Sequence, residues 1–391
     1  MKRKTKHQKW NSFWQMVSIQ MNRNARLTLK GKSWNFRPIR LGVMLLGGLL
    51  ALVILMQLLL IPVRRPKTVD MAFEAGGNYT MLPMGNHILM YNNQHLWEVN
   101  TRGKTVWSTD IAMSHPMVET AKDFILLSDL GGKNESALYR DGKKLRDYNL
   151  GNDIISAKVT PRGWTVFATA TLGYKGRVVV YDKRGKERFS WNSGEGYILD
   201  VALTDNGRYL AVAQLNSDGA QADSKIQFID MNRKKVVATA EREGTVISEL
   251  RFSKDRLLAV SESELCGFKT SGKLAFEVSF SGKNPSKYDI TSDEILAFVT
   301  TDNRGNAVLE LYNTDGKLKG QYRADANITN LSVFEDMVVI AKQREILSIS
   351  PRGKLKKTAT ADLDIKSLGL FGDGHTALAA GNTHAYIVRM R

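Results

Sequence analysis

From residue 68 onward, short runs rich in β-branched and aromatic residues alternate with turn-forming residues. Runs of this kind, bounded by Gly, Asn, Asp and Ser, are typical of strands. Nothing in this region resembles a long amphipathic helix. The pattern therefore predicts an all-β domain.

One phrase recurs along this domain. "LWEVNTRGKTVWSTD" (Leu96–Asp110) returns as "VVVYDKRGKERFSWN" (Val178–Asn192) and as "LELYNTDGKLKGQYR" (Leu309–Arg323). Each copy predicts a hairpin, because an Asp, Asn or Ser precedes a Gly that can adopt positive φ. Seven copies can be followed, and only the fourth, "DMNRK", lacks the Gly. Their turns are marked by Gly103, Gly142, Gly185, Arg233, Gly272, Gly316 and Gly353.

Two further strands precede each hairpin, such as Val246–Phe252 and Arg256–Ser263, which are joined at "SKD". The second strands recur about every 41 residues, which is the period of a four-stranded β-propeller blade. Eight units can be counted, but the last has only three strands. Thr68–Ala75 supplies the missing fourth strand and closes the ring. We expect eight blades, with seven as the alternative.

An uncharged apolar segment precedes the β domain. Leu41–Ile61 holds a single Gln among apolar residues, and it is long enough to cross a bilayer as a helix. Its exit, "PVRRPK", differs from a signal-peptide cleavage site, so we expect an uncleaved anchor. Basic residues are more numerous before it than after it, which places the N-terminus in the cytoplasm. The predicted domains are a basic cytoplasmic tail (1–40), a transmembrane helix (41–63) and an extracytoplasmic propeller (64–391).

The net charge of +17 comes mostly from the tail. Residues 1–40 contain eleven Lys and Arg and no acidic residue, so the rest of the chain has only 45 basic against 39 acidic residues. The tail is either a basic amphipathic helix on an anionic leaflet or a disordered segment. We do not expect it to bind nucleic acid. The residues expected at the membrane surface are Trp10, Phe13, Trp14, Arg37 and Arg40.

The phrase "LWEVNTRGKTVW" resembles the repeat of quinoprotein-like propellers, with a Leu-aromatic strand, a Gly-Lys turn and a closing aliphatic-Trp pair. Trp107 matches the closing aromatic well, while Phe189 and Phe276 match it less well. WD-repeat propellers are architectural relatives, although the chain has no Trp-Asp dipeptide. The whole layout is similar to single-pass membrane propellers of Gram-positive bacteria with no established activity. The resemblance covers about residues 68–391 and implies a fold and a location.

No motif for catalysis, cofactor binding or metal binding emerges from the sequence. Quinoprotein dehydrogenases need a carboxylate-bound calcium and commonly a vicinal disulfide, but the chain has one cysteine, Cys266, and no clear calcium ligand set. The six His form no HExxH motif and there is no GxSxG. We therefore expect no catalytic residue, no cofactor and no metal.

Alignment of the inner strands places charged and polar residues in two columns that share one blade face. Because inner strands surround the central channel, these residues are a candidate site for a small polar ligand. A structural network of ion pairs and waters is the alternative. The candidate channel residues are Glu119, Lys158, Asp200, Glu249, Arg251, Lys287, Asp289 and Asn330.

Loop length varies only in the connections between second and third strands and between blades, and these share one rim of a propeller. Variable loops on a rigid scaffold are where recognition usually resides. The candidate partner-binding residues on this rim are Lys133, Asn134, Tyr174, Asn216, Ser217, Asp218, Asp302 and Asn303.

These features predict a membrane-anchored propeller that binds a protein or polymer of the cell envelope as a scaffold or assembly factor. The alternative is a sensor in which the channel binds a small ligand and the tail relays its presence. A cofactor-dependent enzyme is the least favoured interpretation.

Overall fold

The computed structural model describes residues 79–131, 135–216, 221–280, 282–283, 285–302 and 304–391, together with Thr28–Leu29, Lys32–Ser33, Gly48 and Lys67–Val69. The chain divides into two units, Met1–Arg65 and Pro66–Arg391. In the first unit, β1 (Thr28–Leu29) pairs with β2 (Lys32–Ser33).

The second unit consists of eight four-stranded antiparallel sheets, here called blades 1 to 8 in chain order. The innermost strands are β4 (Thr80–Met84), β8 (Pro116–Ala121), β12 (Ile154–Val159), β16 (Tyr197–Leu203), β20 (Ile247–Ser253), β24 (Lys287–Asp289), β28 (Asn330–Phe334) and β32 (Ser367–Leu370). The second strands are β5 (His87–Tyr91), β9 (Phe124–Asp129), β13 (Thr165–Thr169), β17 (Tyr209–Asn216), β21 (Arg256–Ser261), β25 (Ile295–Thr301), β29 (Met337–Lys342) and β33 (Thr376–Ala380).

The third strands are β6 (His95–Asn100), β10 (Glu135–Arg140), β14 (Gly176–Tyr181), β18 (Asp223–Asp230), β22 (Glu264–Lys269), β26 (Ala307–Asn313), β30 (Glu345–Ile349) and β34 (Ala385–Arg389). The outer strands are β7 (Thr105–Asp110), β11 (Lys143–Asn149), β15 (Glu187–Ser193), β19 (Lys235–Arg242), β23 (Leu274–Ser279), β27 (Leu318–Arg323), β31 (Leu355–Thr360) and, for blade 8, β3 (Lys67–Val69). The prediction of an eight-bladed propeller is confirmed.

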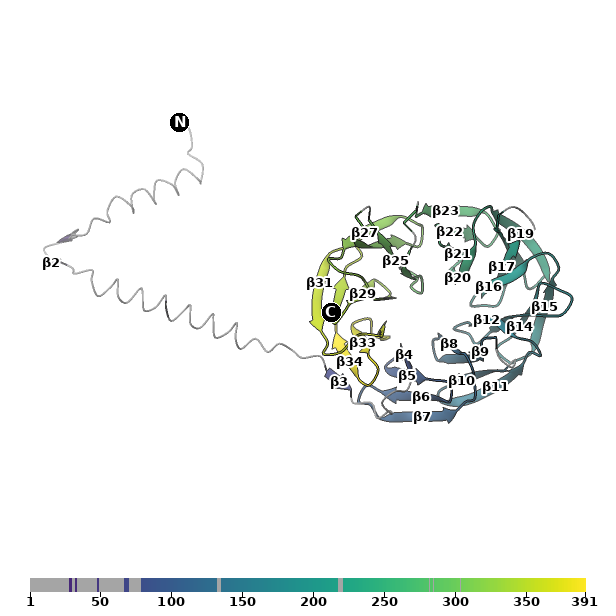
Figure 1. Cartoon of the computed structure of the whole chain (residues 1–391), viewed down its shortest axis with the longest axis horizontal. Coiled ribbons are helices and arrows are strands. Elements are labelled where there is room, and N and C mark those ends of the chain that lie inside the picture. The colour runs from purple at the N-terminus through teal and green to yellow at the C-terminus, as the bar shows by residue number, and fades with distance from the viewer. Residues whose placement is uncertain are drawn as a thin grey trace, which may run out of the picture. The chain divides into compact units, whose positions relative to one another are not determined.

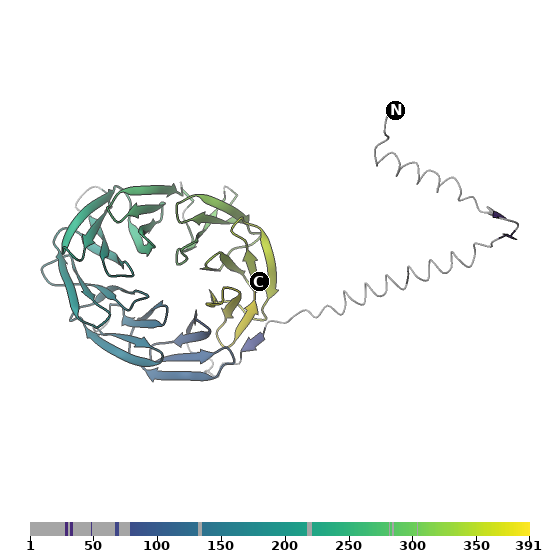
Figure 2. The ribbon, with the colours of Figure 1, turned by 180° about the vertical axis from the view of Figure 1, so that it is seen from behind.

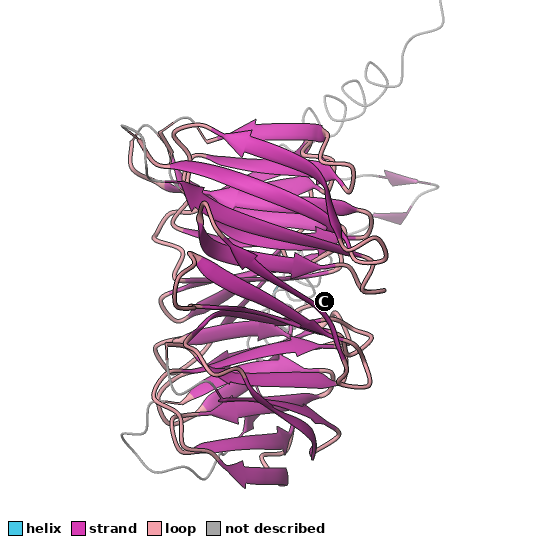
Figure 3. Cartoon of the chain, turned by 90° about the vertical axis from the view of Figure 1, so that its right-hand side faces the viewer, coloured by secondary structure: helices cyan, strands magenta, loops and turns pink. Residues whose placement is uncertain are grey.

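The blades stand radially around a common axis, and the colour passes once around the ring from β4 to β34 (Figure 1). The reverse view shows the same closed ring from behind (Figure 2). Consecutive strands are antiparallel, so successive connections alternate between two rims, which Figure 3 shows edge-on. The turn rim holds the connections from first to second and from third to fourth strands. The loop rim holds those from second to third strands and those between blades.

The last blade is completed by the strand that comes first in the propeller. Lys67, Thr68 and Val69 pair with Ile387, Tyr386 and Ala385 of β34. Val69 is 2% exposed and packs in the core between blades 8 and 1. The expected closing strand is therefore confirmed, with Lys67–Val69 as its bounds. Since β34 ends at the turn rim, antiparallel β3 begins there, and the chain enters the propeller from that rim.

The hydrophobic core lies between neighbouring blades. The second strands are buried on both faces, as in β13, where all five residues are buried. The outer strands instead alternate exposed and half-buried positions, as in β7. This gradient explains why the second strands read as continuous apolar runs and the outer strands as alternating ones.

Outer strands also pack beneath the hairpin turn of the following blade. Trp107 of β7 stacks on Tyr139 of blade 2, with ring centroids 5.9 Å apart. A Cβ on Gly142 would lie 2.6 Å from Cδ1 of Trp107, and Gly142 has a φ of +74°. The turn glycine thus permits both the backbone conformation and the close approach of the neighbouring ring. Trp107 is the closing aromatic residue expected from the sequence.

Among the described residues, no helix is long and apolar enough to span a bilayer. The span expected at 41–63 lies outside these residues apart from Gly48. The tail residues expected at the membrane surface, Trp10, Phe13, Trp14, Arg37 and Arg40, lie outside them as well.

Candidate functional site

Three predicted channel residues meet on neighbouring inner strands. The ammonium group of Lys158 on β12 lies 3.4 Å from a carboxylate oxygen of Glu119 on β8 and 4.0 Å from one of Asp200 on β16. These contacts join blades 2, 3 and 4 near the axis. We call Glu119, Lys158, Asp200 and the neighbouring Glu249 the axial cluster.

Asp200 connects three blades by hydrogen bonds. Its carboxylate accepts a bond of 2.6 Å from the Ser156 hydroxyl of blade 3 and one of 2.7 Å from the backbone N–H of Leu250 in blade 5. Asp200 is 5% exposed. A buried carboxylate with these partners stabilises the blade interfaces and leaves little capacity for a ligand.

Burial disfavours the charged forms of Glu119 and Glu249. Desolvation raises the pKa of both carboxyl groups, against the opposing effect of the Lys158 charge. The pKa of Lys158 is raised because the three surrounding carboxylates outweigh its own desolvation. Burial beside Glu249 raises the pKa of Tyr288 to about 12. The axial cluster therefore contains three carboxyl groups and only one ammonium group. This excess of acidic groups favours the binding of a proton or of a cationic ligand group.

The other predicted channel residues are mostly engaged in contacts between blades. The Arg251 guanidinium donates to the carbonyl of Ile290, and desolvation lowers its pKa. Asp289 accepts a 2.7 Å bond from the backbone N–H of Val333 in blade 7. Asn330 donates to the carbonyl of Lys366 in blade 8 at 3.0 Å. Lys287 is exposed at the start of β24.

The structure thus brings together four of the predicted channel residues, which are Glu119, Lys158, Asp200 and Glu249. The other four lie outside the axial cluster: Arg251, Lys287, Asp289 and Asn330. Sequence reasoning missed Ser156, which lies in the same register column as Asp200 but carries no charge. It also missed Tyr288, which lies between the predicted residues Lys287 and Asp289. Because successive strand residues point to opposite faces, the alternation assigned Tyr288 to the other face of the blade.

Three large hydrophobic side chains are exposed on the loop rim of blades 3 and 4. Leu172 is 94% exposed, Tyr174 is 52% exposed and Tyr197 is 50% exposed. Lys175 lies 4.4 Å from the centre of the Tyr197 ring and donates to its hydroxyl at 3.1 Å. We call Leu172, Tyr174 and Tyr197 the loop-rim patch; only Tyr174 was predicted.

Two other predicted rim residues are described by the structure. Asp302 closes its own loop by accepting bonds from the side-chain amide of Asn306 and from the backbone N–H groups of Asn306 and Arg304. These bonds, the side-chain bond from Asn306 most of all, lower the pKa of Asp302. Asn216 ends β17 and is exposed. The remaining predicted rim residues lie outside the described part of the chain: Lys133, Asn134, Ser217, Asp218 and Asn303.

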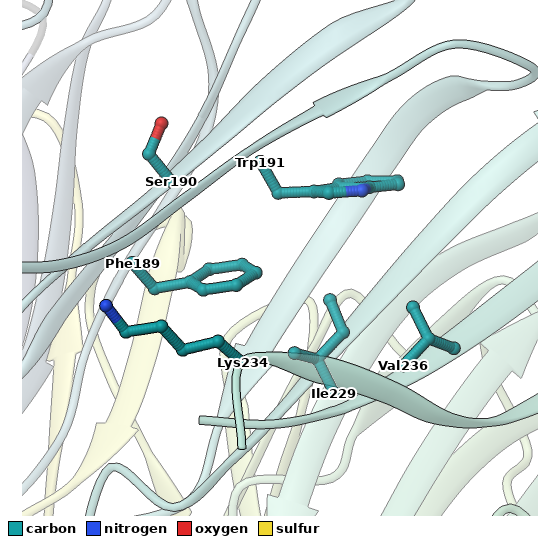
Figure 4. A pocket seen from close by; sticks show the side chains of 6 residues that line it. All are labelled: Phe189, Ser190, Trp191, Ile229, Lys234 and Val236. Carbon is teal, nitrogen blue, oxygen red and sulfur yellow. The ribbon is translucent and has the colours of Figure 1, made fainter. Parts of the chain in front are cut away.

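A groove opens between the outer strands of blades 3 and 4 (Figure 4). Phe189 and Trp191 of β15 face Ile229 and Val236 of blade 4 across a volume of about 360 Å³. Lys234 lies at one side and also lines an adjoining hollow next to Trp164. This is the hairpin without a glycine, and Lys234 itself takes a positive φ of 52°. Its side chain therefore stands where the other turns carry no side chain.

One set of possible metal ligands occurs in the described residues, formed by Glu264, Cys266 and Glu277, whose ligand atoms lie within 4.8 Å of one another. The Arg242 guanidinium donates to Glu264 at 2.7 Å and to Glu277 at 2.8 Å, so both carboxylates are already engaged in ion pairs with it. Burial raises the pKa of the Cys266 thiol, which disfavours the thiolate form that a metal requires. These residues form an ion-pair network between blades 4 and 5.

Fold and surfaces together define a closed eight-bladed β-propeller with a polar axial cluster and an exposed loop-rim patch. The chain belongs to DUF5711, a family of unknown function, whose family model matches residues 66–388. No curated protein matches it in sequence.

Solved structures show the same fold at low sequence identity. BamB from Moraxella catarrhalis is similar with a TM-score of 0.54 and 12% identity, over 83% of this chain and 100% of that one. The C-terminal WD40 domain of Sif2 is similar with a TM-score of 0.58 and 13% identity, over 84% of this chain and 98% of that domain. These likenesses bear out the resemblance to quinoprotein-like and WD-repeat propellers and concern the fold alone.

Proposed function

We propose that the chain is a scaffold or assembly factor of the cell envelope, anchored in the cytoplasmic membrane by residues 41–63. The propeller lies outside the membrane and its loop rim binds a protein or polymer partner. It performs no chemistry itself, and residues 1–40 remain in the cytoplasm.

The observation that carries this proposal is the loop-rim patch. Leu172, Tyr174 and Tyr197 place three exposed large hydrophobic side chains on the loop rim of two neighbouring blades, and grouped exposed apolar side chains mark interaction sites far more often than single ones do. Tyr is enriched among the residues that dominate binding energy, because its ring is large and its hydroxyl remains polar. Both tyrosines of the patch lie on or beside variable-length connections, held by rigid blades.

The proposal is tested by photocrosslinking in native membranes. A photoreactive residue at Tyr174 is compared with one at Asp205, which lies in a turn on the opposite rim of blade 4. We expect a discrete adduct from Tyr174 alone, and we expect Leu172→Ser to remove it. Equal adducts from both positions, or none from Tyr174, would contradict binding through the loop rim.

A second candidate function rests on the axial cluster. Glu119 and Glu249 have raised pKa values and face one ammonium group, which suits recognition of a small cationic or proton-donating ligand. In this sensor, occupancy near the axis is relayed to the cytoplasmic tail. Loss of ligand-induced thermal stabilisation in Glu249→Gln, with retention of the loop-rim adduct, would favour the sensor over the scaffold.

A further inference from the structure

The hairpin turns between third and fourth strands form a basic ring at the outer edge of the turn rim. Together they hold eleven Lys and Arg against three Asp, a net charge of +8. The connections of the loop rim hold six Lys and Arg against eleven Asp and Glu. We call the basic set the turn ring; it consists of residues 101–104, 141–142, 182–186, 231–234, 270–273, 314–317 and 350–354.

An aliphatic side chain follows the turn in six of the seven hairpins. Each lies within the first three residues of the outer strand and is 40–50% exposed. With Val237 they make up seven of the twelve large hydrophobic residues that are exposed in the described part of the chain. The six are Val106, Leu145, Val236, Leu274, Leu318 and Leu355.

Protein surfaces that lie at a membrane interface typically combine Lys and Arg with exposed apolar side chains. The turn ring and its neighbouring aliphatic residues have this composition. The Lys and Arg bind anionic headgroups while the aliphatic groups reach the boundary of the acyl chains. Blade 3 has Glu187 and Arg188 instead of an aliphatic residue, but it contributes the groove with Phe189 and Trp191. Lys186 and Lys234 line the hollow that adjoins this groove.

Chain length adds an independent constraint. β3 begins at Lys67 and enters from the turn rim, so only residues 64–66 separate the proposed span from the propeller. Three residues reach about 10 Å at most. This is about one Debye length at physiological salt, so in the proposed anchored chain the charges near the start of β3 would act on the bilayer surface. Docking of the turn rim would direct the loop rim away from the membrane.

The turns nearer the axis on the same rim are acidic, with four Lys and Arg against eight Asp and Glu. Some of these acids have internal partners: Asp293 accepts from the Ser253 hydroxyl at 2.8 Å, and Asp373 caps its own turn. The attraction to an anionic surface is therefore concentrated on the outer ring of hairpins, away from the axis.

We infer that the turn ring binds the anionic phosphate headgroups of the bilayer in which the chain is anchored. The inference rests on the membrane anchor of the proposed function and adds a second attachment, which fixes the orientation of the propeller. It needs no free ligand and leaves the loop-rim patch available for the partner.

The test uses the full chain in nanodiscs of phosphatidylcholine, alone or in equal mixture with phosphatidylglycerol. A fluorophore is attached at Ser271→Cys in the turn ring or at Ser263→Cys, which is exposed on the loop rim of the same blade. Cys266 is 1% exposed and can remain. A headgroup-labelled quencher lipid reports proximity. We expect Ser271→Cys to be quenched, more strongly with phosphatidylglycerol, and Ser263→Cys to stay bright.

Two matched charge variants accompany the labels. Replacement of Lys273, Lys317, Arg352 and Lys354 by Gln should lower the docked fraction about tenfold or more. The control replaces Lys283, Arg304, Arg344 and Lys366, four exposed cations of the loop rim, and should leave quenching unchanged.

The outcomes separate the two proposals. Extraction of the chain from membranes by alkaline carbonate would overturn the anchor itself. In an anchored chain, quenching that ignores phosphatidylglycerol and the charge variant would overturn headgroup binding. Absence of quenching at Ser271→Cys in every lipid would overturn the inference and assign the cations to an acidic macromolecule.

Discussion

Asp200 of blade 4 accepts a hydrogen bond of 2.7 Å from the backbone N–H of Leu250 in blade 5, fifty positions later in the chain. Asp289 makes the equivalent bond to Val333 between blades 6 and 7 at 2.7 Å. The Ser332 hydroxyl accepts from Leu370 between blades 7 and 8 at 3.1 Å. An inner-strand side chain thus serves repeatedly as acceptor for the next blade, which assigns a structural role to two predicted channel residues.

Asp200→Ala should destabilise the propeller. It leaves the Leu250 N–H and the Ser156 hydroxyl without their acceptor in a buried position, which costs about 2–3 kcal/mol. Urea unfolding of the detergent-solubilised chain, followed by Trp fluorescence, measures this loss. Asp205→Ala, in the exposed turn that follows β16, is the control and should change stability little.

Glu249→Gln should stabilise the folded chain at neutral pH. Burial raises the pKa of Glu249 above its unfolded value, so the folded state favours the protonated form. The contribution of this group to stability is therefore present below the unfolded pKa and lost as pH rises through the folded one. The advantage of the amide should shrink as pH falls toward 4. An advantage independent of pH would contradict this electrostatic account.

Gly142→Ala should destabilise more than Gly85→Ala. Both glycines have positive φ, +74° and +56°, so each substitution costs about 1 kcal/mol in backbone conformation. Only the Cβ at Gly142 would also meet Trp107, whereas nothing lies within 4 Å at Gly85. Displacement of the ring should add about 1–3 kcal/mol. Equal unfolding midpoints for the two variants would show that Trp107 moves aside without cost.

Val69→Asp should open the ring at blade 8. The carboxylate would be buried in the core between blades 8 and 1 without a partner, at a cost of about 3 kcal/mol or more. Limited proteolysis between residues 70 and 80, together with thermal unfolding, detects the released strand. Val246→Asp is the control, because Val246 is 43% exposed.

The repeat pattern predicted the fold well because each blade repeats the same local chemistry. Hairpin turns with a left-handed Gly, such as Gly103 and Gly316, are determined by residues only a few positions apart. The eight second strands begin between His87 and Thr376, at a mean spacing of about 41 residues, as the repeat predicted. The eight-blade count followed from the same periodicity.

The sites were harder to predict because they depend on contacts between blades. The offset between neighbouring inner strands decides which charged residues meet. It places Lys158 beside Glu119 and Asp200, whereas Asn330 lies beside blade 8. The 94% exposure of Leu172 depends on the position of its loop relative to the neighbouring blades, which the local sequence does not specify. The missing Gly at the fourth hairpin was visible in the sequence, but the groove beside Phe189 requires the position of the adjacent blade.

The pairing of Val69 with Ala385 also has a consequence for biosynthesis. The strand that completes blade 8 leaves the ribosome before any other strand of the propeller, yet its partner is made more than three hundred residues later. During that interval seven blades can stack while the ring stays open, and the edges of blade 1 and of the newest blade stay unprotected. Closure is then a late step that joins the two ends of the domain, and contacts this distant in sequence form slowly. A nascent chain arrested before β34 would therefore expose the core of blade 1, making it a substrate for chaperones.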